Sequence, residues 1–260
     1  MPSDEKQAQG MVTSSCDDES SKHSLSSLVA RTRIQPSSQS LFELERSKLL
    51  RINLKPKKDN YAWIKLGCII ARQGDLNTSR QSMREQGLGK IVKKAVSGEG
   101  MNLIKCKGDG IVFCADDDKL VSLVHLHEQT LFLNGNDVLA LSPSLSYDFA
   151  LMKGAHIASG SVFNIKVSGT GIMAFTSRGD VVTLEASPEN PVYTDPNSTV
   201  AWTHQPSTKM ALSMKSIVGR GSGEEVQFEF KGGVVIVQPF EEVPVSEPMR
   251  VPGTPVKVKL

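Results

Sequence analysis

The sequence has few aromatic residues, little net charge and no long apolar run. Aromatic residues make up 5% of the 260 residues, which gives no support to base stacking on single-stranded nucleic acid. The formal net charge of +2 argues against a strong global attraction to nucleic acid or to a membrane. Because no run of 18 apolar residues occurs, no transmembrane helix is predicted. The first ten residues contain acidic side chains and no apolar core, so neither a secretory signal nor a mitochondrial presequence is expected from them.

Cysteine is also scarce, and its spacing does not fit the common metal or redox motifs. The four cysteines are Cys16, Cys68, Cys106 and Cys114, and no two of them form a CxxC pair. Three of them lie in apolar, strand-like stretches, which is typical of buried thiols in a reducing compartment. Cys106 and Cys114 lie at unequal distances from Asp109, so we predict no disulfide between them.

Both ends of the chain lack the apolar residues that a core needs. Residues 1–40 are rich in serine and poor in aromatic residues, so they cannot bury enough apolar surface to offset the entropy lost on ordering. We therefore predict a disordered Ser-rich N-terminal tail over 1–40. Residues 241–260 contain four prolines, a density that forbids a helix or a central strand, and we predict an extended tail there. The folded part is expected to span residues 41–240.

The middle of the chain contains a clear pattern of period two. Short runs of β-branched and apolar residues are separated by Gly, Asn, Asp and Pro, as in VSLVHL, FNIKVSG and VQFEFKGG. This pattern predicts an all-β fold with many short strands. Because glycine adopts positive φ without a Cβ penalty, hairpin turns are predicted at three dipeptides: Asp109-Gly110, Asn134-Gly135 and Gly232-Gly233.

The same turn-and-strand pattern occurs three times, which predicts an internal repeat. Gly110, Gly171 and Gly233 are 61 and 62 residues apart, and each follows an alternating strand and precedes an apolar one. A second landmark is an alanine in each repeat: Ala71, Ala140 and Ala201. We therefore predict three tandem β-sandwich or barrel-like units over about 49–114, 120–176 and 181–238, related by a pseudo-threefold arrangement. The shared central turns are assigned to Gly108, Gly110, Gly169, Gly171, Gly232 and Gly233.

The first unit contains an insertion with the only clear helical pattern in the chain. Apolar residues of 86–97 recur at i, i+3 and i+4, which predicts a short amphipathic helix with Lys90, Lys93 and Lys94 on its outer face. Residues 72–97 include six basic and two acidic side chains. The simplest interpretation is a solvated helix that closes one end of the β core. The alternative is a contact with acidic lipid head groups or RNA.

Motifs for catalysis or metal binding are weak. His125 and His127 are two residues apart on a predicted strand, so they point to the same face and are weak candidates for metal ligands in a cupin-like site. The position where a cupin has its glutamate is Leu131, which favours polar surface instead. GRGSGEE, residues 219–225, resembles a phosphate loop but lacks its lysine and following helix. We therefore predict no catalytic residues, no cofactor and no small-molecule substrate.

The blocks of the middle region resemble the "altered inheritance of mitochondria" family. The matching stretches are LRINLKPKKDNYAWIKLGCIIAR, GLGKIVKKAVSGEGMNLIKCKGDG, LFLNGNDVLALS, ASGSVFNIKVSGTGIMAF and VQFEFKGGVVIV. The resemblance implies a fold related to the trp RNA-binding attenuator protein, built from repeated β units. It also implies a mitochondrial location and a connection with inner-membrane organisation, with the cytoplasm as the alternative location. It supplies no catalytic residues.

Three functions compete on this basis. The first is a non-enzymatic scaffold that self-associates or binds protein partners, with weak peripheral contact to an anionic membrane. The second is an RNA-binding module, whose support is fold analogy and the basic insertion rather than a nucleic-acid motif. The third is a cupin-like metal-binding protein that uses His125 and His127.

Overall fold

The structure is a computed structural model, and the part of the chain that it describes is discontinuous. The described residues are 23–34, 40–57, 60–80, 103–150, 164–212 and 224–242. The chain divides into two compact parts, Met1–Ser38 and Gln39–Leu260. The second part contains the strands, so we call it the β part.

The N-terminal part contains one described helix, α2 (Leu25–Thr32). The hydroxyl of Ser24 accepts a hydrogen bond from the backbone N–H of Ser27 and so caps the first turn. The helix buries no side chain, and Leu25 remains exposed. The segment 1–40 therefore contains a local helix with no buried side chain, and the disorder of this tail stays a prediction. The low apolar content argues against burial, but it does not prevent a capped stretch without Gly or Pro from forming local hydrogen bonds.

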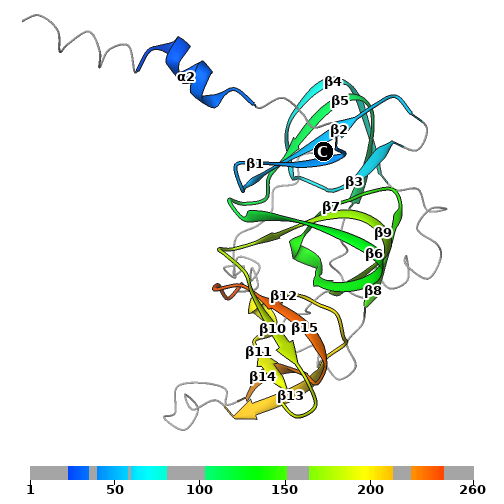
Figure 1. The fold of residues 1–260 in the computed structure, drawn as a ribbon, viewed down its shortest axis with the longest axis vertical. Helices are drawn as coiled ribbons and strands as arrows, with labels where there is room; N and C mark the ends of the chain where they lie inside the picture. Colours follow the sequence, from blue (N-terminus) through cyan, green and yellow to red (C-terminus); the bar gives the residue numbers. More distant parts are fainter. Residues whose placement is uncertain are drawn as a thin grey trace, which may run out of the picture. The chain divides into compact units, whose positions relative to one another are not determined.

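The β part is built almost entirely from strands, which confirms the all-β prediction (Figure 1). The strands are β1 (Phe42–Glu45), β2 (Leu49–Leu54), β3 (Tyr61–Lys65), β4 (Ile69–Arg80), β5 (Leu103–Cys114), β6 (Leu120–Asn134), β7 (Val138–Leu141), β8 (Leu145–Ala150), β9 (Asn164–Ser177), β10 (Val182–Ala186), β11 (Val192–Thr194), β12 (Thr199–Trp202), β13 (Ser207–Leu212), β14 (Glu224–Phe230) and β15 (Gly233–Val237). Two short 3-10 helices, η1 (Gly135–Asp137) and η3 (Pro196–Ser198), precede β7 and β12. We call β2–β5, β6–β9 and β10–β15 the first, second and third β units.

Each β unit has a central stretch of strand that pairs with the other strands of the unit. We call this stretch the central path: it is β5 in the first unit, β9 in the second, and β14 followed by β15 in the third. In the first unit, β5 pairs with β4 along one side, while its other side pairs first with β3 and then with β2. In the second unit, β9 pairs with β6 along one side, and with β8 and then β7 along the other. In the third unit the path is divided: β14 pairs with β11 and β13, and β15 pairs with β10 and β12. The central path therefore changes partners halfway in every unit.

The glycines predicted to form central hairpin turns lie at this change of partners, so the turn prediction is wrong. Gly108 and Gly110 lie inside β5, and Gly169 and Gly171 lie inside β9. Gly232-Gly233 lies between β14 and β15, which pair with different strands and not with each other. Asn134-Gly135 is not a hairpin either, because it leads through η1 from β6 to β7, and these strands do not pair.

The first unit nevertheless shows why glycine is required at these positions. Gly108 and Gly110 have φ of 137° and 155°. A Cβ at Gly108 would lie 2.1 Å from the carbonyl oxygen of Asp75, and one at Gly110 would lie 2.1 Å from that of Gln73. The opposite strand passes too close for any side chain. A strand crossing and a hairpin turn both need glycine, so the glycine pattern alone cannot separate them.

The strand pairs β4–β5, β7–β9 and β12–β15 share one register. In each pair, three residues of the central path are compared: those four, three and two positions after the glycine, which is Gly110, Gly171 or Gly233. These three residues face corresponding positions of the partner strand. These positions are Ile69, Ala71 and Arg72 in β4, Val138, Ala140 and Leu141 in β7, and Thr199, Ala201 and Trp202 in β12. All three pairs have an irregularity between the first and second of these positions. This is the register that the predicted repeat requires, with its three alanines at equal places.

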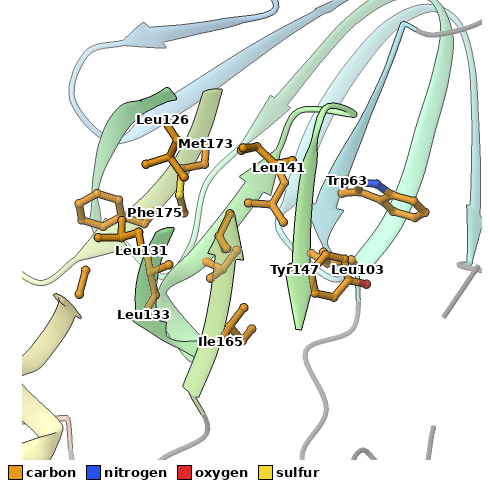
Figure 2. Close-up of a cluster of buried hydrophobic side chains, with 14 of the residues drawn as sticks. Trp63, Leu103, Leu126, Leu131, Leu133, Leu141, Tyr147, Ile165, Met173 and Phe175 are labelled. Carbon is orange, nitrogen blue, oxygen red and sulfur yellow. The ribbon is translucent and has the colours of Figure 1, made fainter. Parts of the chain in front are cut away.

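Three hydrophobic clusters stabilise the β part. The cluster in Figure 2 is centred on the second unit, where Leu131, Ile165 and Phe175 pack together, and Trp63 of the first unit joins it. A second cluster lies mainly in the first unit, around Leu50 and Ile52, and includes Leu139 and Ala140 of the second. The third consists of four buried side chains of the third unit: Trp202, Phe228, Phe230 and Val235. Because two clusters contain residues of more than one unit, neighbouring units share their cores.

Candidate functional site

The two histidines predicted as weak metal candidates lie side by side on β6. The rings of His125 and His127 are nearly parallel, with centroids 6.4 Å apart, and both side chains are exposed, while Leu126 between them is buried. The prediction that they share a face is therefore confirmed. In the part of the chain that the structure describes, no three His, Cys, Asp or Glu side chains gather closely enough to hold a metal ion. The pair accordingly has no third ligand among those residues.

Most of the basic insertion lies outside the described residues, while its first part, residues 72–80, belongs to β4. Lys90, Lys93 and Lys94 belong to the segment 81–102, as does the predicted helix over 86–97. Most of the glycine-rich stretch 219–225 and the tail 243–260 are also outside the description. The predicted contact of these lysines with an acidic surface stays a prediction. The described helices include none that is both long and apolar enough to span a membrane.

The turn between β5 and β6 carries three consecutive aspartates, each of which has its own cationic partner. The Nζ of Lys65 lies 2.8 Å from Asp116 Oδ2. The Nζ of Lys48 lies 2.8 Å from Asp118 Oδ1, and Arg178 forms an ion pair with Asp117. Burial raises the pKa of Asp116, but the hydrogen bond and charge of Lys65, together with Lys119, outweigh burial and lower this pKa. The charges of this turn are therefore neutralised by protein groups.

A more deeply buried ion cluster lies next to this turn. Lys119 Nζ lies 2.8 Å from Asp137 Oδ1, their side chains are only 6% and 1% exposed, and Lys119 also pairs with Glu242. Burial raises the pKa of Asp137 to about 6; Lys119 opposes this shift and the carboxylate of Glu242 adds to it. Burial lowers the pKa of Lys119, but the two carboxylates outweigh burial and raise it. Lys119 directly precedes β6, Asp137 lies in η1 and Glu242 follows β15, and we call these three residues the junction cluster.

The cysteine nearest to these charges is a poor nucleophile. Burial and the neighbouring charge of Asp116 raise the pKa of Cys68 to about 12, and its thiol lies 3.5 Å from Asp116 Oδ1. A thiol with such a pKa remains protonated near neutral pH, whereas the thiolate is the reactive form. Cys68, Cys106 and Cys114 are free and buried, as predicted. The three described thiols are therefore buried side chains of the first unit and not activated nucleophiles.

Two joins between consecutive β units use corresponding positions. The first pairs β3 with β7 and the second pairs β6 with β12, so the sheet continues from one unit into the next. In each join an aromatic residue faces a large apolar one, and an aliphatic residue faces the alanine of the repeat. The facing residues are Trp63 with Leu141 and Ile64 with Ala140 in the first join, and Phe132 with Trp202 and Leu133 with Ala201 in the second.

The strand that would receive a third such join is open. The four residues of β7 and the four of β12 are all buried. The corresponding residues of β4, Ile69–Arg72, are mostly exposed, because β4 pairs only with β5 among the described strands. Ile70 is 60% exposed, whereas its counterparts Leu139 and Val200 are 0% exposed. We call Ile69–Arg72 the head edge.

The third β unit contains the strand that would supply a further join, and the outer edge of that strand is open. β11 occupies the place of β3 and of the second half of β6, because it pairs with the central path on the same side. Among the described strands, β11 pairs only with β14. Tyr193 faces Glu229, three residues before Gly232, as Trp63 faces Lys105 before Gly108 and Phe132 faces Lys166 before Gly169, so these three residues are counterparts. Tyr193 is 48% exposed, and its hydroxyl donates to Glu229 Oε1 at 3.0 Å. We call Val192–Thr194 the tail edge.

The candidate site of this protein is therefore a pair of open strand edges. Sequence reasoning aligned Ala71 with Ala140 and Ala201 but did not identify the edges, since exposure depends on whether a neighbouring strand is present. The junction cluster was also missed, because its three residues are far apart in the sequence and form no motif.

Comparisons with known proteins agree with this architecture. The crystal structure of protein SPYM3_0169 from Streptococcus pyogenes is similar to the chain with a TM-score of 0.56 and 22% sequence identity, covering 77% of this chain and 92% of that one. At this identity the likeness shows a common fold only. No curated protein matches the chain. The model of the family described as "Mitochondrial biogenesis AIM24" matches residues 42–240, nearly all of the β part. The chain belongs to the mitochondrial biogenesis AIM24 family.

Proposed function

We propose that this protein is a non-enzymatic scaffold in mitochondrial biogenesis that self-associates or binds protein partners. The observation that carries the proposal is the open head edge. It has the register of two buried strands in the same chain, yet Ile70 is 60% exposed. Unpaired strand edges are templates for adding a strand from another chain.

The electrostatics of the described residues support the same function. The carboxylate of Asp116, which follows the first unit, pairs with Lys65 at 2.8 Å, and Glu242, which follows the third unit, pairs with Lys119 at the start of the second. Such pairs keep the units in fixed positions, which a scaffold needs in order to present its edges in one geometry. The family resemblance adds inner-membrane organisation as the process that the scaffold serves, and the mitochondrion as its location.

The function is tested by removing the protein from cells that carry its gene and restoring it as a tagged full-length chain. We expect the tagged chain in mitochondria, altered inner-membrane shape in its absence by electron microscopy, and recovery with the wild-type chain. A chain with Leu139→Asp, which disrupts the buried core, serves as the control that should not restore the shape. Normal membrane shape without the protein would contradict the proposal.

Two measurements on the purified full-length chain test the alternatives. RNA retention that falls steeply with salt would favour the RNA-binding module, because phosphate contacts weaken as salt rises. A stoichiometric bound metal that is lost on changing His125 and His127 to alanine would favour the cupin-like protein. The scaffold proposal expects neither result, and it expects a mass above that of a monomer as concentration increases.

A further inference from the structure

We infer that two copies of this chain associate head to tail, the head edge of one copy pairing with the tail edge of the other. This inference rests on the self-association in the proposed function and names its surface and its partner. The starting observation is that each chain already contains two joins between β units with corresponding residues. In a chain of three such units, one edge that could receive a join and one edge that could supply a join have no neighbouring unit.

The two unused halves are complementary. The head edge is the counterpart of β7 and β12, which receive a strand in the internal joins, and the tail edge is the counterpart of β3 and the second half of β6, which supply it. Within the described part of the chain β4 and β11 do not pair with each other. A second copy supplies a strand of the required register and direction to each edge. Because the two surfaces differ, the contact is heterologous and produces either a ring or an open row of copies.

The register of the internal joins specifies which residues meet. Tyr193 corresponds to Trp63 and Phe132, so it would face Arg72 of the second copy, and Thr194 would face Ala71. A guanidinium on an aromatic ring is a favourable pair. Glu229, whose side chain is 3% exposed, accepts the hydroxyl hydrogen bond of Tyr193 and so orients its ring, while the same carboxylate pairs with Lys231 Nζ at 3.6 Å. The attraction expected across this join is therefore that of the Arg72 guanidinium for the Tyr193 ring.

The chemistry of the edges favours a reversible contact. The internal joins bring together large apolar residues such as Trp63 with Leu141. The external join would instead bring together Arg72 with Tyr193 and Ala71 with Thr194, side chains that tolerate water. The irregularity near Ala71 does not protect the edge from pairing, since the equivalent irregularities of β7 and β12 lie within completed joins. We therefore expect a reversible association that depends on concentration.

The test measures the mass of the purified full-length chain by sedimentation over a hundredfold range of concentration. Wild type should exceed the monomer mass as concentration increases. Ile70→Asp places a charge in the head edge, and Tyr193→Lys places a like charge opposite Arg72; each should weaken association at least tenfold. Arg72→Glu is a second head-edge variant, which removes the guanidinium expected to face the Tyr193 ring. Val182→Asp, on the exposed strand β10, is the matched control and should associate like wild type.

A mixture of two variants identifies the head-to-tail arrangement. Ile70→Asp retains a working tail edge and Tyr193→Lys retains a working head edge, so an equal mixture should form dimers that grow no further. If both variants associate as wild type does, or if their mixture remains monomeric while wild type associates, the head-to-tail inference is overturned and self-association itself stands. If wild type is monomeric at every concentration, self-association fails together with the inference.

Discussion

The head edge in β4 and the strand β7 occupy the same place in two β units, yet one is exposed and the other is buried. Both pair with the central path of their unit in the same register. Ile70 is 60% exposed, and its counterpart Leu139 is 0% exposed. The two segments have similar composition, IIAR against VLAL, so their own residues do not cause the difference. The cause is the neighbour across the outer edge: β7 has β3 there, and β4 has no strand among those described.

The largest expected effect comes from placing the same charge at the two counterpart positions. Leu139→Asp puts an unpaired carboxylate into the core and should reduce the free energy of unfolding by about 4 kcal/mol or more. Ile70→Asp should change it by less than about 0.5 kcal/mol, because the site is exposed in the single chain. Urea unfolding of both variants at low protein concentration measures the difference. Equal losses would mean that the exposure of the head edge is not a property of the isolated chain.

The glycines at the change of partners extend the comparison to all three units. A Cβ at Gly108 would lie 2.1 Å from a backbone oxygen, one at Gly169 would lie 3.2 Å from one, and one at Gly232 meets nothing within 4 Å. Gly108→Ala should therefore cost about 3 kcal/mol or more of stability, Gly169→Ala about 1 to 2, and Gly232→Ala less than about 0.5. Thermal unfolding of the three variants gives the order. Similar costs at Gly108 and Gly232 would show that the strands of the first unit can move apart.

The residue before β7 differs from the residue before β12, which allows a further comparison between the second and third units. Asp137 immediately precedes β7, and Ser198 holds the equivalent position before β12. Asp137→Ser removes one of the carboxylates facing buried Lys119, and we expect a loss of about 1 to 3 kcal/mol at pH 7, where Glu242 still offsets part of the charge. Lys48→Ala breaks the exposed pair with Asp118 and should cost less than about 0.5 kcal/mol. Denaturant unfolding of both variants checks this, and an equal cost would contradict the buried role of the junction cluster.

The smallest expected effect is the pH dependence of the destabilisation that Asp137→Ser causes. Burial raises the pKa of Asp137 to about 6, so between its ordinary value of 3.8 and about 6 the folded chain binds more protons at this group than the unfolded chain does. The stability that this group contributes is present below its ordinary pKa and is lost as pH rises through its folded pKa. The destabilisation by Asp137→Ser should accordingly be greater at pH 4 than at pH 7. A constant difference between wild type and variant across this range would show that the pKa of Asp137 is not raised.

Much of the β part could be predicted from the sequence, because alternating apolar residues and glycine breaks reflect local geometry. The predicted all-β class is confirmed, and Ala71, Ala140 and Ala201 take equal places in three strand pairs. The predicted hairpin turns were wrong for a physical reason. A glycine at positive φ serves a turn and a strand crossing equally well, and only the partner strand distinguishes them.

The candidate site was less predictable than the fold. The shared face of His125 and His127 followed from the two-residue period of a strand. The junction cluster did not, since Lys119, Asp137 and Glu242 approach one another only after the units pack. The helix Leu25–Thr32 was not predicted, because composition predicts burial better than it predicts local hydrogen bonding.

The sequence by itself determined the strand periodicity, the spacing of the three repeated landmarks and the small number of reactive groups, because these depend on residue type and order. The tertiary structure decided which copy of a repeated strand is buried and which is open. That outcome depends on the presence of a neighbouring strand, which no local pattern encodes. Ile70 and Leu139 have the same kind of side chain at the same register, and the strand β3 beside β7 is what removes Leu139 from water.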